Sequence, residues 1–320
     1  MAKTLYIGLG GLGMRVVSEL KKKQGDEDSF YLVFDCDIAD MKENIMENEI
    51  DSIYCPHFRP KDYIEMCQGI KDWFPSTPLL LNVSSYETQG VRALGRLAFL
   101  SVLNDSRRLE VERFFGRVLV EKPYETALRI VIVTSLAGGL GSGLFISFAV
   151  WLRDFLKKSN FTNYAIDGFF VGSEMFADCF EFLRDDPERL LCMRANTYAA
   201  LKELELISEV GKDAYLPSRK DDLFKNSEFY GLTSVYDRIY IFDDSLSCGS
   251  YDTVIGRIAE ICRQSLPPIA GRISEEIQEF LSDSPELQRS YELVCGRLKD
   301  SYDSPLNPHL DKRWLGRFCE

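Results

Sequence analysis

The stretch that decides the fold is Leu128-Arg-Ile-Val-Ile-Val-Thr-Ser-Leu-Ala-Gly-Gly-Leu-Gly-Ser-Gly143. Its first part is rich in β-branched residues, which predicts a strand in the centre of a sheet. The glycine loop 137–143 then leads into an apolar helix that we expect to end near Lys157. Glycines between a strand and a helix let backbone N–H groups close around phosphate oxygens, and the helix N-terminus adds a positive dipole end. The stretch therefore predicts a phosphate site.

A second glycine loop lies near the N-terminus. Residues 3–7 predict a short strand, and Gly8-Leu-Gly-Gly-Leu-Gly13 leads into a helix predicted from Met14 to Lys23. The spacing also matches the dinucleotide-binding fingerprint, with Asp35 about twenty residues further on. A dinucleotide needs one such turn, whereas two loops suit a nucleoside di- or triphosphate held from both sides. An NAD-dependent oxidoreductase that uses the first loop alone stays the alternative.

Strands and helices alternate along the chain. Further strands are predicted at 30–34, 79–81, 165–171 and 237–242, and helices at 91–103, 187–208 and 251–265. Each connection is long enough for a crossover, so the pattern predicts an α/β fold with a mainly parallel, Rossmann-like sheet and helices on both faces. Pro267-Pro268 stops the last helix. We therefore expect a nucleotide-binding domain at 1–266 and a short helical C-terminal region at 267–320.

Composition narrows the function classes. The net charge is -12, and no run of basic residues exceeds Lys21-Lys22-Lys23, which argues against a nucleic-acid partner. No apolar stretch reaches the roughly eighteen residues of a transmembrane helix, and no signal peptide precedes the first strand. The nine cysteines include no Cys-x-x-Cys pair and the two histidines exclude a multi-histidine metal site. We expect a cytoplasmic protein with free thiols and no protein-bound metal.

Both loops resemble those of the tubulin and bacterial cell-division GTPase superfamily. Ile7-Gly-Leu-Gly-Gly-Leu-Gly13 is similar to its first phosphate loop, and Ser135-Leu-Ala-Gly-Gly-Leu-Gly-Ser-Gly143 is similar to its signature loop Gly-Gly-Gly-Thr-Gly-Ser-Gly. Gly95-Arg-Leu-Ala-Phe99 and Asn196-Thr-Tyr-Ala-Ala-Leu-Lys-Glu-Leu204 most resemble the divergent bacterial tubulin-like branch. The resemblance covers about residues 3–266 and implies GTP or GDP as the ligand, with or without Mg²⁺.

The resemblance also implies which residues bind the nucleotide. Arg194 is placed like a ribose or base contact, with a solvated helix arginine as the alternative, and Tyr251 like the aromatic that stacks on guanine. Asp35 and Asp37 either orient a magnesium-bound water or cap the following helix. The whole set is Gly10, Gly11, Leu12, Gly13, Asp37, Gln89, Gly90, Gly138, Gly139, Leu140, Gly141, Ser142, Arg194, Asp244 and Tyr251.

Several positions depart from the superfamily pattern. The signature threonine is Leu140 here, the base-reading asparagine falls on Asp244, and Ile255 stands four residues after the stacking aromatic. The acidic loop that completes a neighbouring subunit's GTPase site is not recognisable after Ser265, so no catalytic residue is assigned. We expect slow or absent GTP hydrolysis and no self-polymerisation. A non-hydrolysing scaffold, whose nucleotide switches a protein partner or a homo-oligomer, is the further alternative.

Overall fold

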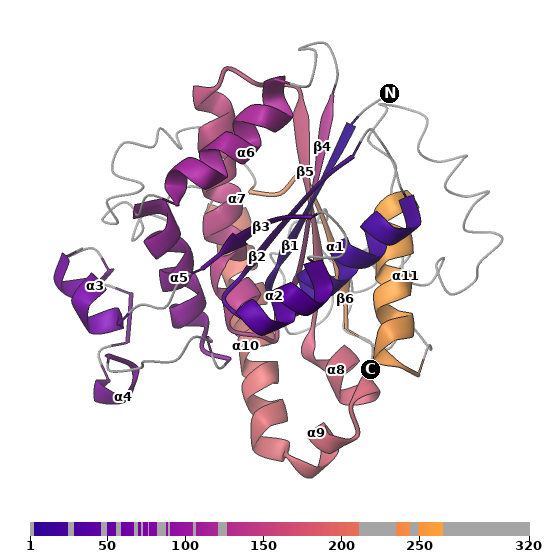
Figure 1. Ribbon diagram of the computed structural model, residues 1–320. Coiled ribbons are helices and arrows are strands. Elements are labelled where there is room, and N and C mark those ends of the chain that lie inside the picture. The colour runs from indigo at the N-terminus through magenta and orange to yellow at the C-terminus, as the bar shows by residue number, and fades with distance from the viewer. Residues whose placement is uncertain are drawn as a thin grey trace.

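A parallel six-stranded sheet forms the centre of the molecule (Figure 1). The computed structural model describes residues 3–24, 29–45, 50–55, 59–66, 70–71, 73–75, 77–81, 88, 90–104, 107–120, 127–210, 235–243 and 249–264. The strand order is β3-β2-β1-β4-β5-β6, and every neighbouring pair is parallel. The strands are β1 (Lys3–Leu9), β2 (Ser29–Asp35), β3 (Asp51–Tyr54), β4 (Leu128–Ser135), β5 (Tyr164–Val171) and β6 (Arg238–Phe242).

Helices cover both faces of this sheet, so the predicted Rossmann-like α/β fold is confirmed (Figure 1). One layer contains α1 (Gly10–Gln24), α2 (Ile38–Ile45) and α11 (Tyr251–Gln264). The other contains α5 (Arg92–Asn104), α6 (Arg108–Val120) and α7 (Leu140–Lys158). The remaining helices are α3 (Pro60–Met66), α4 (Pro78–Leu81), α8 (Ser173–Cys179), α9 (Phe182–Asp185) and α10 (Pro187–Val210).

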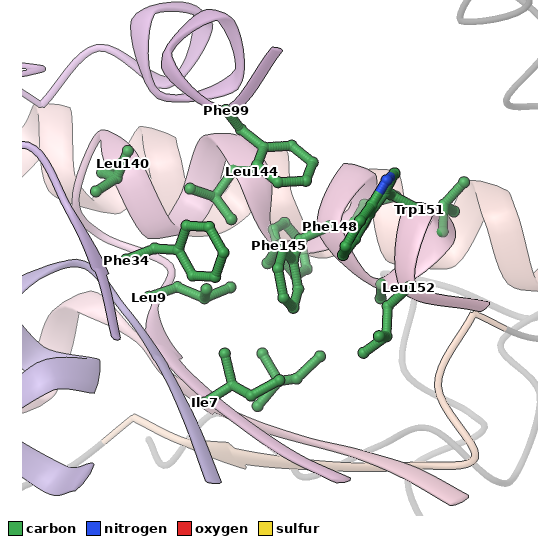
Figure 2. Close-up of a cluster of buried hydrophobic side chains, with 14 of the residues drawn as sticks. Ile7, Leu9, Phe34, Phe99, Leu140, Leu144, Phe145, Phe148, Trp151 and Leu152 are labelled. Carbon is green, nitrogen blue, oxygen red and sulfur yellow. The ribbon is translucent and has the colours of Figure 1, made fainter. Parts of the chain in front are cut away.

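Each face of the sheet buries its own apolar cluster. Along β1, Leu5, Ile7 and Leu9 belong to the cluster under α5 and α7, whereas Tyr6 belongs to the cluster under α1 and α11. Successive side chains of a strand point to opposite faces, so a strand covered on both sides must be apolar throughout. This explains the Ile-Val-Ile-Val run of β4, which is buried along its whole length. Figure 2 shows how the side chains of α7 fill the space above the strands.

One predicted strand is a helix in the structure, and one strand at the edge of the sheet was not predicted. Residues 79–81, predicted as a strand, lie in α4, where Pro78 occupies the first helical position and Leu81 N donates to Thr77 O at 3.0 Å. Proline is favoured at that position, and three leucines carry no period to separate strand from helix. The edge strand β3, Asp-Ser-Ile-Tyr, was not predicted because only Ile53 of its four residues is buried.

The helix after the first glycine loop also begins four residues earlier than predicted, at Gly10 and not at Met14. The loop glycines are therefore part of the first helical turn, which brings their backbone N–H groups to the helix N-terminus. The predicted boundary at 266/267 and the C-terminal region 267–320 lie outside the described residues, as do Gln89 and Asp244.

Candidate functional site

The two glycine loops meet at the carboxyl edge of the sheet. β1 and β4 are neighbours at the point where the strand order reverses, and β1 leads into α1 on one face while β4 leads into α7 on the other. A Cβ atom built on Gly10 would stand 3.5 Å from Gly141 N, and Thr134 Oγ1 donates to Leu9 O at 2.9 Å. In open α/β sheets such a switch point is the place where ligands bind. The two predicted phosphate loops thus lie side by side at the switch point, and the region outside the carboxyl ends of β1 and β4 is here called the crevice.

The second loop presents uncapped amides to this crevice. Ala137 N donates to Ser135 Oγ at 3.0 Å, and Leu136 N donates to Val171 O at 2.8 Å. These two hydrogen bonds hold the segment that leads into α7. Gly139 is the N-cap residue of α7, and no described side chain caps it. The first N–H groups of a helix have no partner within the helix, so they are available to an anion.

Close packing explains some of the loop glycines. A Cβ atom on Gly139 would lie 2.5 Å from Thr88 Oγ1 and 2.8 Å from Val91 N, and one on Gly141 would overlap the Thr134 side chain. Gly138 differs, because no described atom lies within 4 Å of the position a Cβ would take. Neighbouring glycines therefore differ: 139 and 141 allow close packing, whereas a side chain at 138 would meet none of the described residues.

Two leucines of the predicted site turn their side chains away from the crevice. Leu12 and Leu140 are 6% and 4% exposed, and each packs into the apolar cluster on its own face of the sheet (Figure 2 for Leu140). Only their backbone N–H groups remain to face a ligand. Ser142 is buried as well, and its Oγ accepts a hydrogen bond from Arg92 Nε at 2.8 Å.

The first loop is bordered by an acidic group. Gly10 has a left-handed φ of +75°, which favours glycine, and a Cβ on Gly11 would lie 3.2 Å from Asp40 Oδ2. Asp40 pairs with Arg15 at 3.3 Å, and burial raises the pKa of Asp40 while Arg15 lowers it. The Arg15 guanidinium lies 5.9 Å from the ring centre of Tyr251, the first residue of α11. Tyr251 therefore borders the pair of Arg15 and Asp40.

The aspartate that ends β2 and the one two residues later have separate roles. Asp37 Oδ1 accepts from Ala39 N at 2.8 Å and from Asp40 N at 3.1 Å, so Asp37 caps α2. Asp35 is buried, and its Oδ1 accepts from Cys36 N at 2.7 Å and Asp37 N at 3.2 Å. Burial raises the pKa of Asp35 to about 6, against the lowering effect of those N–H groups. Its Oδ2 has no hydrogen-bond partner among the described residues.

The ends of β5 and β6 hold the other predicted contacts. Arg194 makes a bidentate pair with Glu174, both bonds at 2.6 Å, and this hydrogen bonding lowers the pKa of Glu174. Glu174 N in turn donates to Asp243 Oδ1 at 2.9 Å. The ring centres of Tyr251 and Phe180 lie 4.9 Å apart, and burial raises the pKa of the Tyr251 hydroxyl to about 12. Arg194 is thus paired with Glu174, and its side chain remains 52% exposed, so both the ligand contact and the solvated arginine stay open.

The sequence did not predict Asn196, which joins the second glycine loop to the turn at Gly90. Asn196 of α10 donates from Nδ2 to Gly90 O at 2.7 Å and to Ala137 O at 3.0 Å. Gly90 itself has a left-handed φ of +76° in a turn closed by Val91 N and Thr88 O at 2.8 Å. The available signal was an asparagine, a weak helix former, next to the buried positions of a long helix.

Comparison with known proteins identifies the family. A family model described as "Tubulin like" matches residues 5–253, which include both glycine loops and the start of α11. The chain belongs to this tubulin-like family. A search of curated proteins gave no significant match to the tubulin-like chain.

Solved structures similar to the tubulin-like chain include two archaeal proteins and one phage protein. CetZ2 from Haloferax volcanii, a GTPγS-bound protofilament, has 14% identity and a TM-score of 0.43, over 82% of this chain and 56% of that one. CetZ1 from Haloferax volcanii, a GDP-bound monomer, has 15% identity and a TM-score of 0.44, over 88% and 64%. Clostridium botulinum phage c-st TubZ has 12% identity and a TM-score of 0.39, over 87% and 65%. The tubulin-like chain thus spans less than two thirds of each of these proteins.

The described residues were also searched for a membrane-spanning helix and for a cluster of metal ligands. None of the helices in the described part is both long and apolar enough to cross a bilayer. Within the same residues, no three histidine, cysteine or acidic side chains gather as metal ligands would.

Proposed function

We propose that this tubulin-like chain binds a guanine nucleotide, GTP or GDP, at the carboxyl edge of the sheet between β1 and β4. The observation that carries the proposal is the contact between the two loops, in which a Cβ on Gly10 would stand 3.5 Å from Gly141 N. The phosphates lie between the N-termini of α1 and α7, which reach the crevice from opposite faces. Two helix dipoles then attract the same anion.

Backbone amides supply most of the phosphate contacts in this proposal. Gly10 to Gly13 contribute from the first loop, and Gly138 to Ser142 contribute from the second. Because the side chains of Leu12 and Leu140 are buried, these two residues act through their N–H groups alone. Gly138 and Gly90 border the space that the phosphates need, since no described atom lies within 4 Å of a Cβ at either position.

The base and ribose lie on the side of Tyr251 and Arg194. Tyr251 offers an aromatic face next to Phe180, and Arg194 is fixed by two hydrogen bonds to Glu174. The choice of guanine follows from membership of the tubulin-like family and from the loop resemblance. Asp37, Gln89 and Asp244 complete the proposed set, the last two from outside the described residues.

A magnesium ion fits this site only together with the nucleotide. Mg²⁺ keeps several waters and takes one or two carboxylates plus substrate phosphates. Near the first loop, Asp37 already caps α2 and Asp40 is paired with Arg15. We therefore propose that Mg²⁺ arrives bound to the phosphates and is not held by these carboxylates alone.

We propose further that hydrolysis is slow or absent and that the chain acts in the cytoplasm on a protein partner or on further copies of itself. Leu140 brings no hydroxyl to the phosphates, and its side chain is committed to the core. The described cysteines are free thiols, as a reducing compartment requires.

A thermal-shift series with GTP, GDP, ATP and NAD tests the proposal. Ligand at a hundred times its Kd should add about 2.7 kcal/mol to the free energy of unfolding. GTP and GDP should raise the melting temperature, while ATP and NAD should leave it near that of the free protein. A shift with NAD alone would instead establish the single-loop oxidoreductase, and equal shifts with GTP and ATP would remove guanine specificity from the proposal.

A further inference from the structure

Asn196 lies where three segments of the site meet. Its Nδ2 donates to Gly90 O at 2.7 Å and to Ala137 O at 3.0 Å. Both partners are carbonyl oxygens, which only accept hydrogen bonds, so the carboxamide must present its NH₂ group and not its oxygen. The two hydrogens of that group satisfy one carbonyl each. One side chain on α10 therefore ties the turn before α5 to the loop before α7.

The rotation of α10 about its axis is fixed by its other contacts. Thr197, Ala200 and Leu204 are buried, which anchors one side of the helix against the core. Glu203 lies seven residues after Asn196, two helical turns along the same side. It holds Arg92 through bonds of 2.9 Å and 2.6 Å.

Arg92 carries this second connection onward to the loop. Its Nη2 donates to Ser142 O at 3.0 Å, in addition to the bond from Nε to Ser142 Oγ. The helix thus holds the second loop at two points, directly at Ala137 and through Arg92 at Ser142.

The geometry of the peptide bond gives the Asn196 contact a consequence in the crevice. A trans peptide is planar, and its C=O and N–H point in opposite directions. When Ala137 O points to Asn196, the N–H of Gly138 must point away from α10. No described atom outside its chain neighbours lies within 4 Å of a Cβ built on Gly138, and the neighbouring first turn of α7 carries no described side-chain cap. The orientation of one carbonyl therefore decides whether the loop offers one more amide to an anion.

We propose that Asn196 is a positioning residue of the phosphate site, which holds the Gly90 turn and the second glycine loop together so that Gly138 N–H faces the phosphates. The inference rests on the proposed function, since it concerns the same nucleotide. Asn196 acts through the backbone it orients and does not touch the ligand. Its removal must therefore weaken binding of the phosphates and leave binding of the nucleoside unchanged.

The test measures the Kd of GTP, GDP and guanosine by competition against a fluorescent GDP analogue. Asn196→Asp keeps the shape of the side chain but turns an acceptor toward both carbonyls, so the contact becomes repulsive. Asn196→Ala removes the donors without adding charge. Both variants should bind GTP and GDP on the order of 10-fold more weakly, as expected for the loss of this pair of partly exposed hydrogen bonds. The Kd of guanosine should stay within about twofold, because no base contact is altered.

Asn163→Asp is the matched control. Asn163 is exposed and precedes β5 at the opposite end of the sheet, so the same change of charge is made far from the crevice. This variant should bind GTP like the wild type. Circular dichroism and the melting temperature without nucleotide show which variants are folded, and if Asn196→Asp does not fold, Asn196→Ala decides the question.

The outcomes distinguish the positioning role of Asn196 from nucleotide binding itself. Wild-type affinity for GTP in a folded Asn196→Ala protein would overturn the positioning role and leave the proposed function intact. An equal loss of GTP and guanosine affinity would also overturn it, since that points to the base or to the fold. A wild-type protein that binds none of the three ligands would overturn the proposed function, and the role of Asn196 with it.

Discussion

The second loop contains closely packed glycines and one glycine that no described residue crowds. Substitutions at the two kinds of position should have different effects. Gly139 has no room for a side chain, because a Cβ atom there would lie 2.5 Å from Thr88 Oγ1 and 2.8 Å from Val91 N. Gly138 has room, and its backbone is not left-handed. A side chain at 138 therefore enters the space where we place the phosphates without disturbing the fold.

We predict that Gly138→Val folds like the wild type and loses nucleotide binding. Its free energy of unfolding should change by no more than about 0.5 kcal/mol, whereas Gly139→Val should lose about 1–3 kcal/mol through overpacking. Denaturant unfolding and GTP titration measure the two effects. Gly116→Val is the control, because Gly116 lies on α6 and also has open space around a Cβ. Unchanged GTP affinity in Gly138→Val would place the phosphates elsewhere.

Asp35 makes a prediction about pH. Asp35 is 5% exposed, and burial raises the pKa of its carboxyl group from 3.8 to about 6. The folded protein therefore binds this proton more tightly than the unfolded chain does. The stabilising effect is complete below about pH 4 and is lost as the pH rises through 6.

Asp35→Asn should remove that dependence. At pH 7.5 the variant should be more stable than the wild type by on the order of 1–3 kcal/mol, and at pH 4 the difference should vanish. The difference between the two denaturation curves isolates Asp35 from Asp40, whose pKa burial also raises. A variant that is less stable at pH 7.5 would show that the unpaired Oδ2 has a partner in solution.

At the end of the sheet opposite the glycine loops, one buried aspartate joins three strands and, through an arginine, a helix. Asp167 of β5 is fully buried and accepts from Arg129 Nε of β4 at 2.9 Å and from Arg238 of β6 at 2.7 Å and 2.6 Å. Arg129 also donates to Cys262 O near the end of α11 at 2.9 Å. Removing the acid leaves a buried arginine without its counter-charge.

Asp167→Ala should therefore cost about 3–5 kcal/mol of unfolding free energy. The exposed pair of Asp51 and Arg117 provides the comparison, and Asp51→Ala should cost less than about 1 kcal/mol. Urea denaturation measures both. GTP affinity should be unchanged in either variant under folding conditions, since the network lies at the edge of the sheet away from the glycine loops. A shared loss of affinity would mean that the two ends of the sheet are coupled.

The sequence predicted the central elements better than the peripheral ones, for a physical reason. β1, β4 and β5 are buried on both faces and must be apolar at nearly every position, which leaves a readable pattern. β3 at the edge is half exposed, and its pattern is lost among polar neighbours.

In the site, glycine spacing predicted which loops meet. It could not predict that Asn196 reaches Gly90 across 106 residues, because that contact depends on how α10 packs.

For the whole molecule we predict slow or absent GTP hydrolysis and no filaments. In this superfamily the attacking water is positioned by a neighbour's acidic residue, an orientation effect that is commonly worth orders of magnitude in rate. No such acidic loop is recognisable in the sequence after Ser265, a segment that lies outside the described residues. Sedimentation with GTP, run beside phosphate release, measures both properties. Pelleted polymer, with release that rises steeply with protein concentration, would reveal a working site between subunits.

The hydrogen bond from Thr134 Oγ1 to Leu9 O joins residues 125 positions apart. A ribosome therefore releases β1, α1 and β2 well before it has made the strand that completes the crevice. β1 and β2 can pair early because only α1 and its flanking residues separate them, whereas docking β4 must first overcome the entropy of closing a long loop. A nucleotide that needs both loops cannot assist the nascent N-terminal half. Under the proposed function, the nucleotide stabilises only chains in which β4 has already docked, and no precursor that lacks this strand.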